Sequence, residues 1–158
     1  MLVLDIEASG TNASKHSIVS LGALDLNNPS DQLYLECRIW QGAHSDPEAL
    51  AVNGFTEAEI NDPNKMTEEE LLRNFIGWAM TLSDQTLAGQ NVSFDRDFIQ
   101  AACLRNREPF PFAHRMLDTH TMAYTHMVER GVSPPFGFFI SISQGAPQPR
   151  KTLLQSPH

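Results

Sequence analysis

The segment Leu2–Thr11 has the sequence LVLDIEASGT, and the fold can be inferred outward from it. Its first residues are apolar, as in a buried strand, and acids then stand at Asp5 and Glu7. Residues two apart in a strand face the same side, so the two carboxylates point into one space. Carboxylates held that close repel each other, and a bound divalent cation would neutralise them. The alternative is a solvated strand end without a ligand.

Gly10 follows the two acids after a short interval. A glycine at this place lets the backbone approach a ligand closely and offers N–H groups that no side chain blocks. This favours a site for a metal ion and a nucleotide over a solvated strand end.

A second polar motif, GQNVSFD at residues 89–95, lies where a predicted strand over Thr86–Gly89 gives way to a helix. We expect Ser93 to cap that helix. Asp95 falls in the first helical turn, where the helix dipole favours an acid whatever its role. The helix dipole also explains Asp97, and the sequence offers less support for a functional role of Asp97 than of Asp95.

The remaining N-terminal sequence alternates apolar and polar residues, as half-buried strands do. It predicts three consecutive strands, with a turn between the second and third at Asn27–Ser30. The predicted strands are Leu2–Ile6, Ser17–Leu26 and Gln32–Trp40.

Short helices are expected from Asp46, an N-cap candidate that precedes a proline, as far as Ile60. A clearer helix begins at Thr67, which forms a capping box with Glu70. This helix presents an apolar face made of Leu71, Phe75, Trp78, Ala79 and Leu82.

Two more helices complete the pattern. The helix that follows the second polar motif ends near Asn106, and Asp118 is positioned to cap a last helix over Thr119–Arg130. Gly131 ends that helix. The sequence beyond Gly131 is rich in Pro, Gly and Ser without helical periodicity, so we predict loop or poor order there.

The composition limits the class of protein. The 158 residues, 41% of them hydrophobic, suffice for one domain with an ordinary core. A net charge of -8 argues against wrapping long duplex nucleic acid, which needs many Lys and Arg contacts to phosphate. The sequence shows no apolar run long enough for a membrane span, and Cys37 and Cys103 are too far apart for a Cys-x-x-Cys site. We therefore expect a cytoplasmic protein.

The order Asp-x-Glu, small residue, Gly and then Asn-x-x-Phe-Asp at residues 91–95 resembles the DEDD (DnaQ-like) 3'-5' exonuclease superfamily. Within this superfamily, the sequence resembles the oligoribonucleases and the polymerase proofreading exonucleases. Pro47–Thr56, PEALAVNGFT, also resembles the family segment that packs near the terminal nucleotide. The resemblance covers Leu2–Val132, so we expect an exonuclease-like domain over residues 1–132 and an irregular or divergent tail over 133–158.

The resemblance implies an RNase H-like α/β fold with a mixed central sheet flanked by helices. It implies that Asp5, Glu7 and Asp95 hold two Mg2+ or Mn2+ ions and catalyse hydrolysis at the 3' end of single-stranded DNA, RNA or a short oligonucleotide. The implied substrate contacts are Ile6, Ala8, Ser9, Gly10, Leu50, Asn53, Phe55, Asn91 and Phe94. For Ile6, Ala8, Leu50 and Phe55, which are apolar, a place in the core is an equally good interpretation. Whether the protein forms a homodimer stays open.

The last family motif is missing. The family places a fourth carboxylate on a C-terminal helix, after a histidine or tyrosine, but no aspartate follows Asp118 in this sequence. Asp118 is better explained as a cap. Glu129 lacks the required context, and His158 is the one candidate for the catalytic histidine. We therefore expect a truncated or divergent chain without the C-terminal helix.

Three functions are consistent with these motifs. The leading one is a metal-dependent 3'-5' exonuclease whose activity is impaired in this chain. The alternative is a catalytically inactive exonuclease-like module that binds nucleic acid or protein. An RNase H-type endonuclease would need a more basic surface for a duplex, and the Asn-x-x-Phe-Asp motif argues against it.

Overall fold

The computed structural model of the protein describes residues 1–132. The chain divides into two compact units, Met1–Thr119 and His120–His158. The first unit contains the sheet and four helices, and the described part of the second is essentially helix α5 (Thr119–Glu129). His158 and the predicted irregular tail over 133–158 lie outside the described residues.

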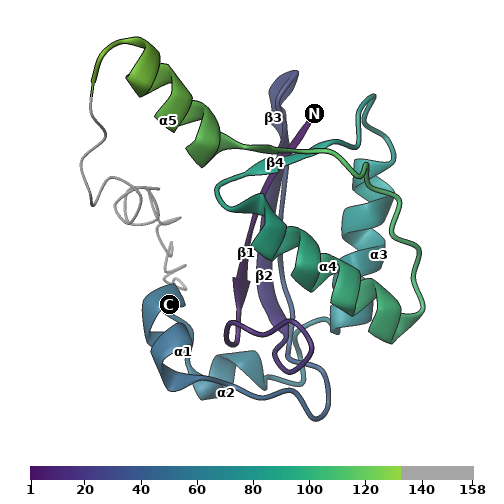
Figure 1. Ribbon diagram of the computed structural model, residues 1–158. Coiled ribbons are helices and arrows are strands. Elements are labelled where there is room, and N and C mark those ends of the chain that lie inside the picture. Colours follow the sequence, from purple (N-terminus) through teal and green to yellow (C-terminus); the bar gives the residue numbers. More distant parts are fainter. Residues whose placement is uncertain (133–158) are drawn as a thin grey trace, which may run out of the picture. The chain divides into compact units, whose positions relative to one another are not determined.

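The first unit is built on one five-stranded sheet, which Figure 1 shows nearly edge-on. The strand order is β3-β2-β1-β4-β5. Neighbouring strands β1–β2 and β2–β3 are antiparallel, whereas β1–β4 and β4–β5 are parallel, which confirms the predicted mixed sheet. The strands are β1 (Leu2–Ala8), β2 (Ile18–Asp25), β3 (Asn28–Glu36), β4 (Leu87–Gly89) and β5 (Met116–Asp118).

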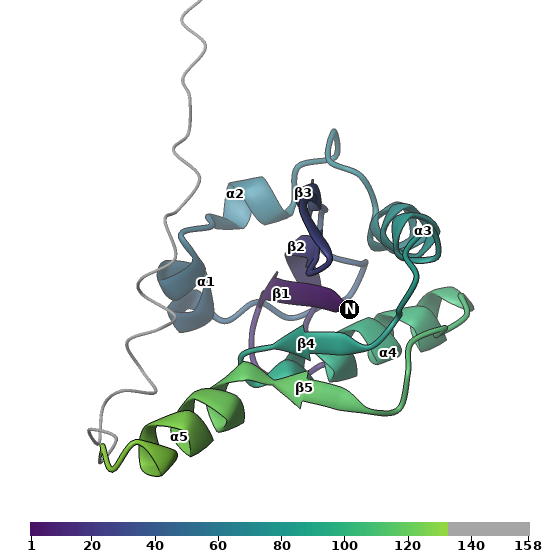
Figure 2. The same ribbon diagram turned by 90° about the horizontal axis from the view of Figure 1, so that it is seen from above.

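Helices α3 (Glu68–Ala79) and α4 (Val92–Asn106) lie on the same side of the sheet, as Figure 2 shows. The short helices α1 (Pro47–Asn53) and α2 (Glu57–Ile60) lie near the end of β1 (Figure 1). Within residues 1–132, no helix is long and apolar enough to cross a membrane.

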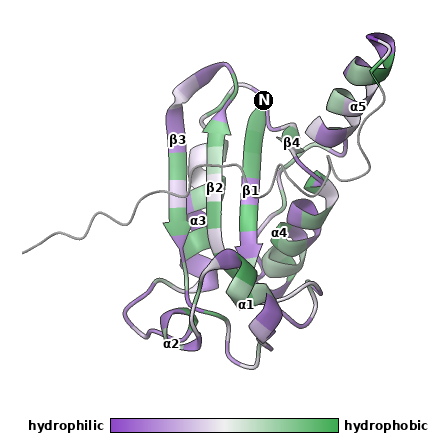
Figure 3. Cartoon of the chain, turned by 90° about the vertical axis from the view of Figure 1, so that its left-hand side faces the viewer, coloured by the Kyte–Doolittle hydropathy of each residue, from purple (hydrophilic) through white to green (hydrophobic). Residues whose placement is uncertain are grey.

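The core lies between the sheet and the α3–α4 layer. In β1 every second residue is buried, and these residues pack with Phe75 of α3 and Phe98 of α4. In Figure 3, β1 and β2 are largely hydrophobic, whereas the edge strand β3 mixes hydrophilic and hydrophobic residues. Because side chains alternate along a strand, burying Leu4 and Ile6 turns Asp5 and Glu7 to the opposite face. The core therefore sets the direction of the two acids.

Several predicted helix starts are confirmed by hydrogen bonds. The Asp46 side chain accepts from the Glu48 N–H at the start of α1, with Pro47 in the first helical position. Thr67 and Glu70 form the predicted capping box of α3. Gly131 has a left-handed φ of 70° just after α5, as expected at a helix end.

Both ends of strand β3 differ from the prediction. The turn before it lies at Leu26–Asn27, earlier than the predicted Asn27–Ser30, because Asn28 already pairs with Asp25. Pro29 is tolerated in this strand because β3 is an edge strand, where a missing N–H can face away from the partner. The strand also ends at Glu36, before the predicted limit of Trp40.

The predicted cap of α4 is also wrong. Asn91, and not Ser93, is the N-cap; its φ of 53° is left-handed and its side chain makes no capping bond. Ser93 lies inside the helix, and its hydroxyl donates to Asn91 Oδ1 at 3.2 Å. The chain turns more sharply from β4 into α4 than an extended cap residue would allow, and asparagine tolerates that conformation better than most residues.

The approach of β4 to β1 gives a first test. A Cβ added at Gly89 would lie 2.6 Å from the carbonyl oxygen of Leu4, a backbone atom that cannot move aside cheaply. We expect Gly89→Ala to lower the free energy of unfolding by about 1–3 kcal/mol, measured by urea denaturation.

Gly77→Ala is the matched control. Gly77 is inside α3, and an added Cβ there would meet no atom within 4 Å. This variant should gain up to about 1 kcal/mol from helix propensity. Equal effects of the two substitutions would contradict the close approach of β4 to β1.

Candidate active site

The acidic pair lies at the end of β1 on the face opposite the α3–α4 layer. Asp5 is exposed and Glu7 is half-buried, and their strand neighbours Leu4 and Ile6 are buried. Across the β1–β2 ladder the two acids face Gly22 and Ser20, which are small. These cross-strand neighbours are small, so they do not cover the two carboxylates as large side chains would.

Asp95 is held against the edge of β1. Its Oδ1 accepts a hydrogen bond from the Ile6 N–H at 2.9 Å, and only 3% of the residue is exposed. The register of β1 with β4 covers only Leu2 and Val3. The Asp95 carboxylate takes the place of a strand partner for the N–H that lies between Asp5 and Glu7.

The three acids influence one another electrostatically. Burial raises the pKa of Asp95 to about 7, and the charges of Asp5 and Glu7 act in the same direction, against the bond from Ile6. Desolvation by the surrounding protein also raises the pKa of Asp5. Burial raises the pKa of Glu7, with a further contribution from Asp5. Each proton bound here replaces a positive charge that a cation would supply.

The donor set fits a hard divalent cation, because carboxylate oxygens are what Mg2+ and Mn2+ prefer. Among residues 1–132, however, no three His, Cys, Asp or Glu side chains are already grouped around a point that could hold an ion. One oxygen of Asp95 is engaged by the Ile6 N–H. The acids are thus neighbours without forming a closed cluster.

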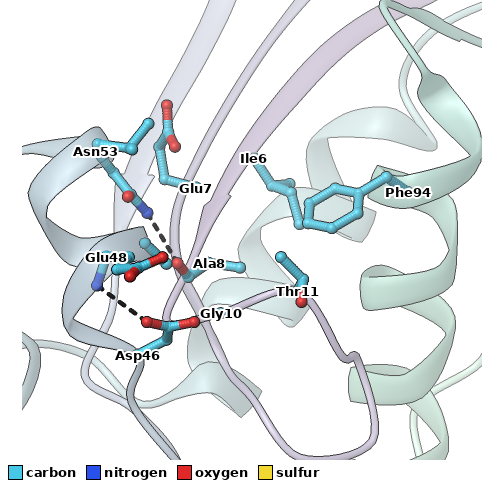
Figure 4. A pocket seen from close by; sticks show the side chains of 11 residues that line it. Ile6, Glu7, Ala8, Gly10, Thr11, Asp46, Glu48, Asn53 and Phe94 are labelled. Carbon is cyan, nitrogen blue, oxygen red and sulfur yellow. Dashed lines mark hydrogen bonds between the residues drawn. The ribbon is translucent and has the colours of Figure 1, made fainter.

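A pocket of about 330 Å3 opens beside Glu7. Figure 4 shows Ile6 and Phe94 on one side of it and the residues of α1 on the other. Asn53 donates from Nδ2 to the Ala8 carbonyl oxygen at 2.8 Å, which fixes α1 to the end of β1. The lining residues are Ile6, Glu7, Ala8, Gly10, Thr11, Asp46, Glu48, Ala49, Val52, Asn53 and Phe94.

The pocket brings together five of the nine predicted substrate contacts: Ile6, Ala8, Gly10, Asn53 and Phe94. Its lining also includes residues outside those nine predicted contacts, namely Thr11, Asp46, Glu48, Ala49 and Val52. The last three lie in Pro47–Thr56, the segment expected near the terminal nucleotide. Several of these residues recur at helical spacing along PEALAVN. The face of α1 that includes Asn53 could therefore have been predicted from the sequence to line the pocket.

The other four predicted contacts lie outside the pocket lining. Ser9 is fully buried, and Leu50 belongs to a small core cluster with Val19 and Ile60. Phe55 packs against that cluster, with the Lys65 ammonium 5.0 Å from its ring centroid. Asn91 is exposed at the start of α4. For Leu50 and Phe55 the structure favours the core interpretation.

The two acids weighed as substitutes for the missing carboxylate lie in different places. Asp118 is the last residue of β5 and is paired with Gly89 in the parallel ladder. Glu129 is the last residue of α5 and is exposed. Asp118 does not line the pocket beside Glu7.

A mixed five-stranded sheet, with an acidic pair on its central strand β1 and a third acid from α4, the helix after the neighbouring strand β4, defines an α/β domain of the RNase H-like class. A family model for the RNase T exonucleases matches residues 2–132. The chain belongs to this exonuclease family.

Related sequences agree with this assignment. The ribonuclease T of Escherichia coli K12 is 30% identical over 141 residues, and that of Vibrio vulnificus is 27% identical over 139. Each alignment covers 77% of this chain and 63% of the relative. The chain therefore spans less than two thirds of the length of these ribonucleases.

Solved structures show the same fold. An E. coli exonuclease I–ssDNA complex in its zinc-bound form superposes with a TM-score of 0.69 at 19% identity, covering 86% of this chain and 31% of that one. Exonuclease I from Methylocaldum szegediense gives a TM-score of 0.67 at 20% identity, covering 82% and 30%. The predicted RNase H-like fold is confirmed.

The raised pKa of Asp95 gives a test of the site. The pKa is about 7 in the folded chain against 3.8 for a free carboxyl, so the unfolded carboxyl loses its proton first as pH rises. The stability cost grows between about pH 4 and pH 7 and is fully present above that range. In EDTA, we expect Asp95→Asn to raise the free energy of unfolding at pH 8 by a few kcal/mol, about 1.4 per unit of pKa.

The gain should disappear near pH 4, where the asparagine and the protonated acid are both neutral. Urea titrations at the two pH values measure the difference. Asp97→Asn is the control, because Asp97 is exposed and bonded to Arg96 and should show no such gain. An Asp95→Asn effect of the same size at both pH values would contradict a buried, repelled carboxylate.

Proposed function

We propose that the protein is a metal-dependent 3'-5' exonuclease that hydrolyses phosphodiester bonds at the 3' end of single-stranded or short nucleic acid. One observation supports this above the others: Asp95 bonds to the backbone N–H between Asp5 and Glu7, and Glu7 also lines a pocket. The three acids and the pocket therefore share one end of β1.

The pocket suits a terminal nucleotide. Its volume of about 330 Å3 is at the lower end of the usual range for small-ligand sites. Ile6 and Phe94 offer an apolar surface to a base, and the Thr11 hydroxyl is a polar group for the sugar. Base–aromatic stacking tolerates any base, which fits a sequence-independent exonuclease.

The cofactor in this proposal is Mg2+ or Mn2+, with two ions in the complete site. Asp5, Glu7 and Asp95 would hold it through their carboxylate oxygens. When bound, such ions activate a water molecule and stabilise the leaving oxygen. The protein positions these oxygens by the alternation of β1 and by the Ile6–Asp95 hydrogen bond.

The proposed substrate is a single strand or a short oligonucleotide. With a net charge of -8, the protein is poorly suited to long duplexes, whereas a strand end can be held locally through cations and stacking. The related exonuclease I has been solved with single-stranded DNA, and the sequence relatives are ribonucleases. Both DNA and RNA are therefore candidate substrates. A homodimer and a cytoplasmic location remain proposals, the latter consistent with the free, buried Cys37 and Cys103.

We expect the hydrolysis to be slow. Within these 158 residues, the family's fourth carboxylate has no evident counterpart, since no aspartate lies between Asp118 and His158. With fewer carboxylates, the site offers less negative charge to hold two divalent ions. Binding of a strand end without cleavage is the alternative function.

The test is release of mononucleotides from a short 5'-labelled single strand, DNA and RNA in parallel, with Mn2+ or Mg2+. We expect 3'-to-5' shortening well below about 1 per second, the low end of common enzyme rates. Asp5→Asn and Glu7→Gln should each abolish it, because each removes a proposed metal ligand.

Asp97→Asn is the matched control, since Asp97 lies two residues from Asp95 but is exposed and paired with Arg96. It should retain the activity of the unmodified chain. Strand binding without shortening, measured by fluorescence anisotropy, would favour the binding module. Metal-dependent shortening that persists in Asp5→Asn would contradict the proposed site.

A further inference from the structure

We propose that Glu68, together with Arg105, is a positioning residue of the candidate site, which it reaches through Ser17 and Ser9. Glu68 does not line the pocket, and its carboxylate is far along the chain from the site acids. This inference rests on the proposed function for the meaning of the site, but the contacts that support it are independent of that function.

Glu68 is a charged side chain in the core. Only 2% of the residue is exposed, and each of its carboxylate oxygens accepts two hydrogen bonds. Arg105 donates from Nε and Nη2 at 2.9 and 2.8 Å, in the two-pronged geometry that is strongest for this pair. Asn106 and Ser17 donate the other two, each at 3.1 Å.

The position of Glu68 in α3 does not require an acid of this kind. Glu68 is the first residue of α3, where the helix dipole favours an acid, but Glu69 and Glu70 already supply that charge from more exposed positions. A buried ion pair replaced by apolar residues often leaves stability unchanged or higher. The specific bonds of Glu68, rather than its charge alone, therefore need an explanation.

One of these bonds leads toward the pocket. The Ser17 hydroxyl has one proton and two acceptors within reach, Glu68 Oε1 and the Ile18 carbonyl oxygen, each at 3.1 Å. The ion-paired carboxylate is the stronger acceptor of the two. The Ser17 N–H donates to Ser9 Oγ at 3.0 Å, and the Ser9 N–H donates to the Ser17 carbonyl oxygen at 2.9 Å. Glu68 thus fixes Ser17, whose backbone makes two hydrogen bonds to Ser9 just after the end of β1.

Ser9 distributes this constraint to the pocket walls. Its hydroxyl donates to the His44 carbonyl oxygen at 2.7 Å, and its own carbonyl oxygen accepts from the Asp46 N–H at 2.7 Å. Asp46 caps α1 and lines the pocket, and Gly10, directly after Ser9, lines it too. The buried Ser9 thereby joins β1 to the segment from which α1 starts.

Arg105 adds a second route to the same segment. Its guanidinium carbon lies 4.7 Å from the Trp40 ring, so the arginine is held between an acid and an aromatic face. The backbone N–H of Trp40 donates to Ser17 Oγ at 3.4 Å. The chain from Trp40 to Asp46 is therefore anchored at its start by Arg105 and near its end by Ser9.

Glu68→Gln tests the proposal with little change of shape. The amide offers a donor where Arg105 needs an acceptor, which leaves part of the half-buried guanidinium unpaired. We expect amide hydrogen exchange at Ser9 and Asp46 to accelerate at least tenfold more than at the amides of the β2–β3 ladder. We also expect Mn2+ to bind at least threefold more weakly, with an altered EPR spectrum of the bound ion.

Glu69→Gln is the matched control, because it makes the same chemical change one residue along in a partly exposed surface pair with Arg73. It should alter neither readout. If Glu68→Gln does not fold, Ser17→Ala removes the hydroxyl that joins Ser17 to Glu68, while keeping the Glu68–Arg105 pair and the backbone bonds between Ser17 and Ser9. The proposal would be overturned if, in the variant used, amide exchange at Ser9 and Asp46 accelerates no more than exchange at the amides of the β2–β3 ladder.

Asp5→Asn separates this inference from the proposed function. It should abolish Mn2+ binding and leave the exchange of Ser9 and Asp46 as it is in the unmodified chain. If Mn2+ binding is unaffected by Asp5→Asn, the proposed metal site fails, and the exchange comparison alone then decides whether Glu68 positions this end of β1.

Discussion

The hydrogen bond from the Ile6 N–H to Asp95 is the interaction on which the arrangement of the site depends. The register of β1 with β4 covers only Leu2 and Val3, and the strand N–H beyond this pairing is satisfied by the side chain of a helix. Asp95 therefore serves the sheet and the site with the same carboxylate. The close approach of Gly89 to the Leu4 carbonyl oxygen fixes where β4 ends, and so where α4 begins.

The features that could be predicted from the sequence depend on short-range patterns. Alternation in LVLDIE placed Asp5 and Glu7 on one face, and capping chemistry located α1 and α3 at Asp46 and Thr67. Strand alternation and helix capping each depend on residues only a few positions apart in the sequence. The misplaced cap of α4 had a different cause, because the tight turn at Asn91 follows from where β4 must stop against β1, which local propensity does not contain.

Only part of the pocket lining could be predicted from the sequence, because the rest depends on how distant elements pack. Ile6, Gly10 and Phe94 belong to motifs, whereas Thr11 and Val52 line the pocket only because α1 is fastened beside the end of β1 by Asn53. Ser9 is a different case: its motif position suggests substrate contact, and in the structure its hydroxyl bonds to His44 and Ser17. Glu68 could not have been found from the sequence, because an acid at a helix start needs no further explanation.

The order of the strands has a consequence for how the chain folds. Strands β1, β2 and β3 are consecutive hairpin neighbours, whereas the pairing of Leu2 with Leu87 closes a long loop, which is entropically slower. Asp5 and Glu7 thus lie in the part of the sheet that can form first, and Asp95 joins them only when α4 docks. The repulsion among the three acids is therefore met late in folding, after the antiparallel half of the sheet can already supply a stable base. A divalent ion present at that stage would favour the docking step rather than the formation of the hairpins.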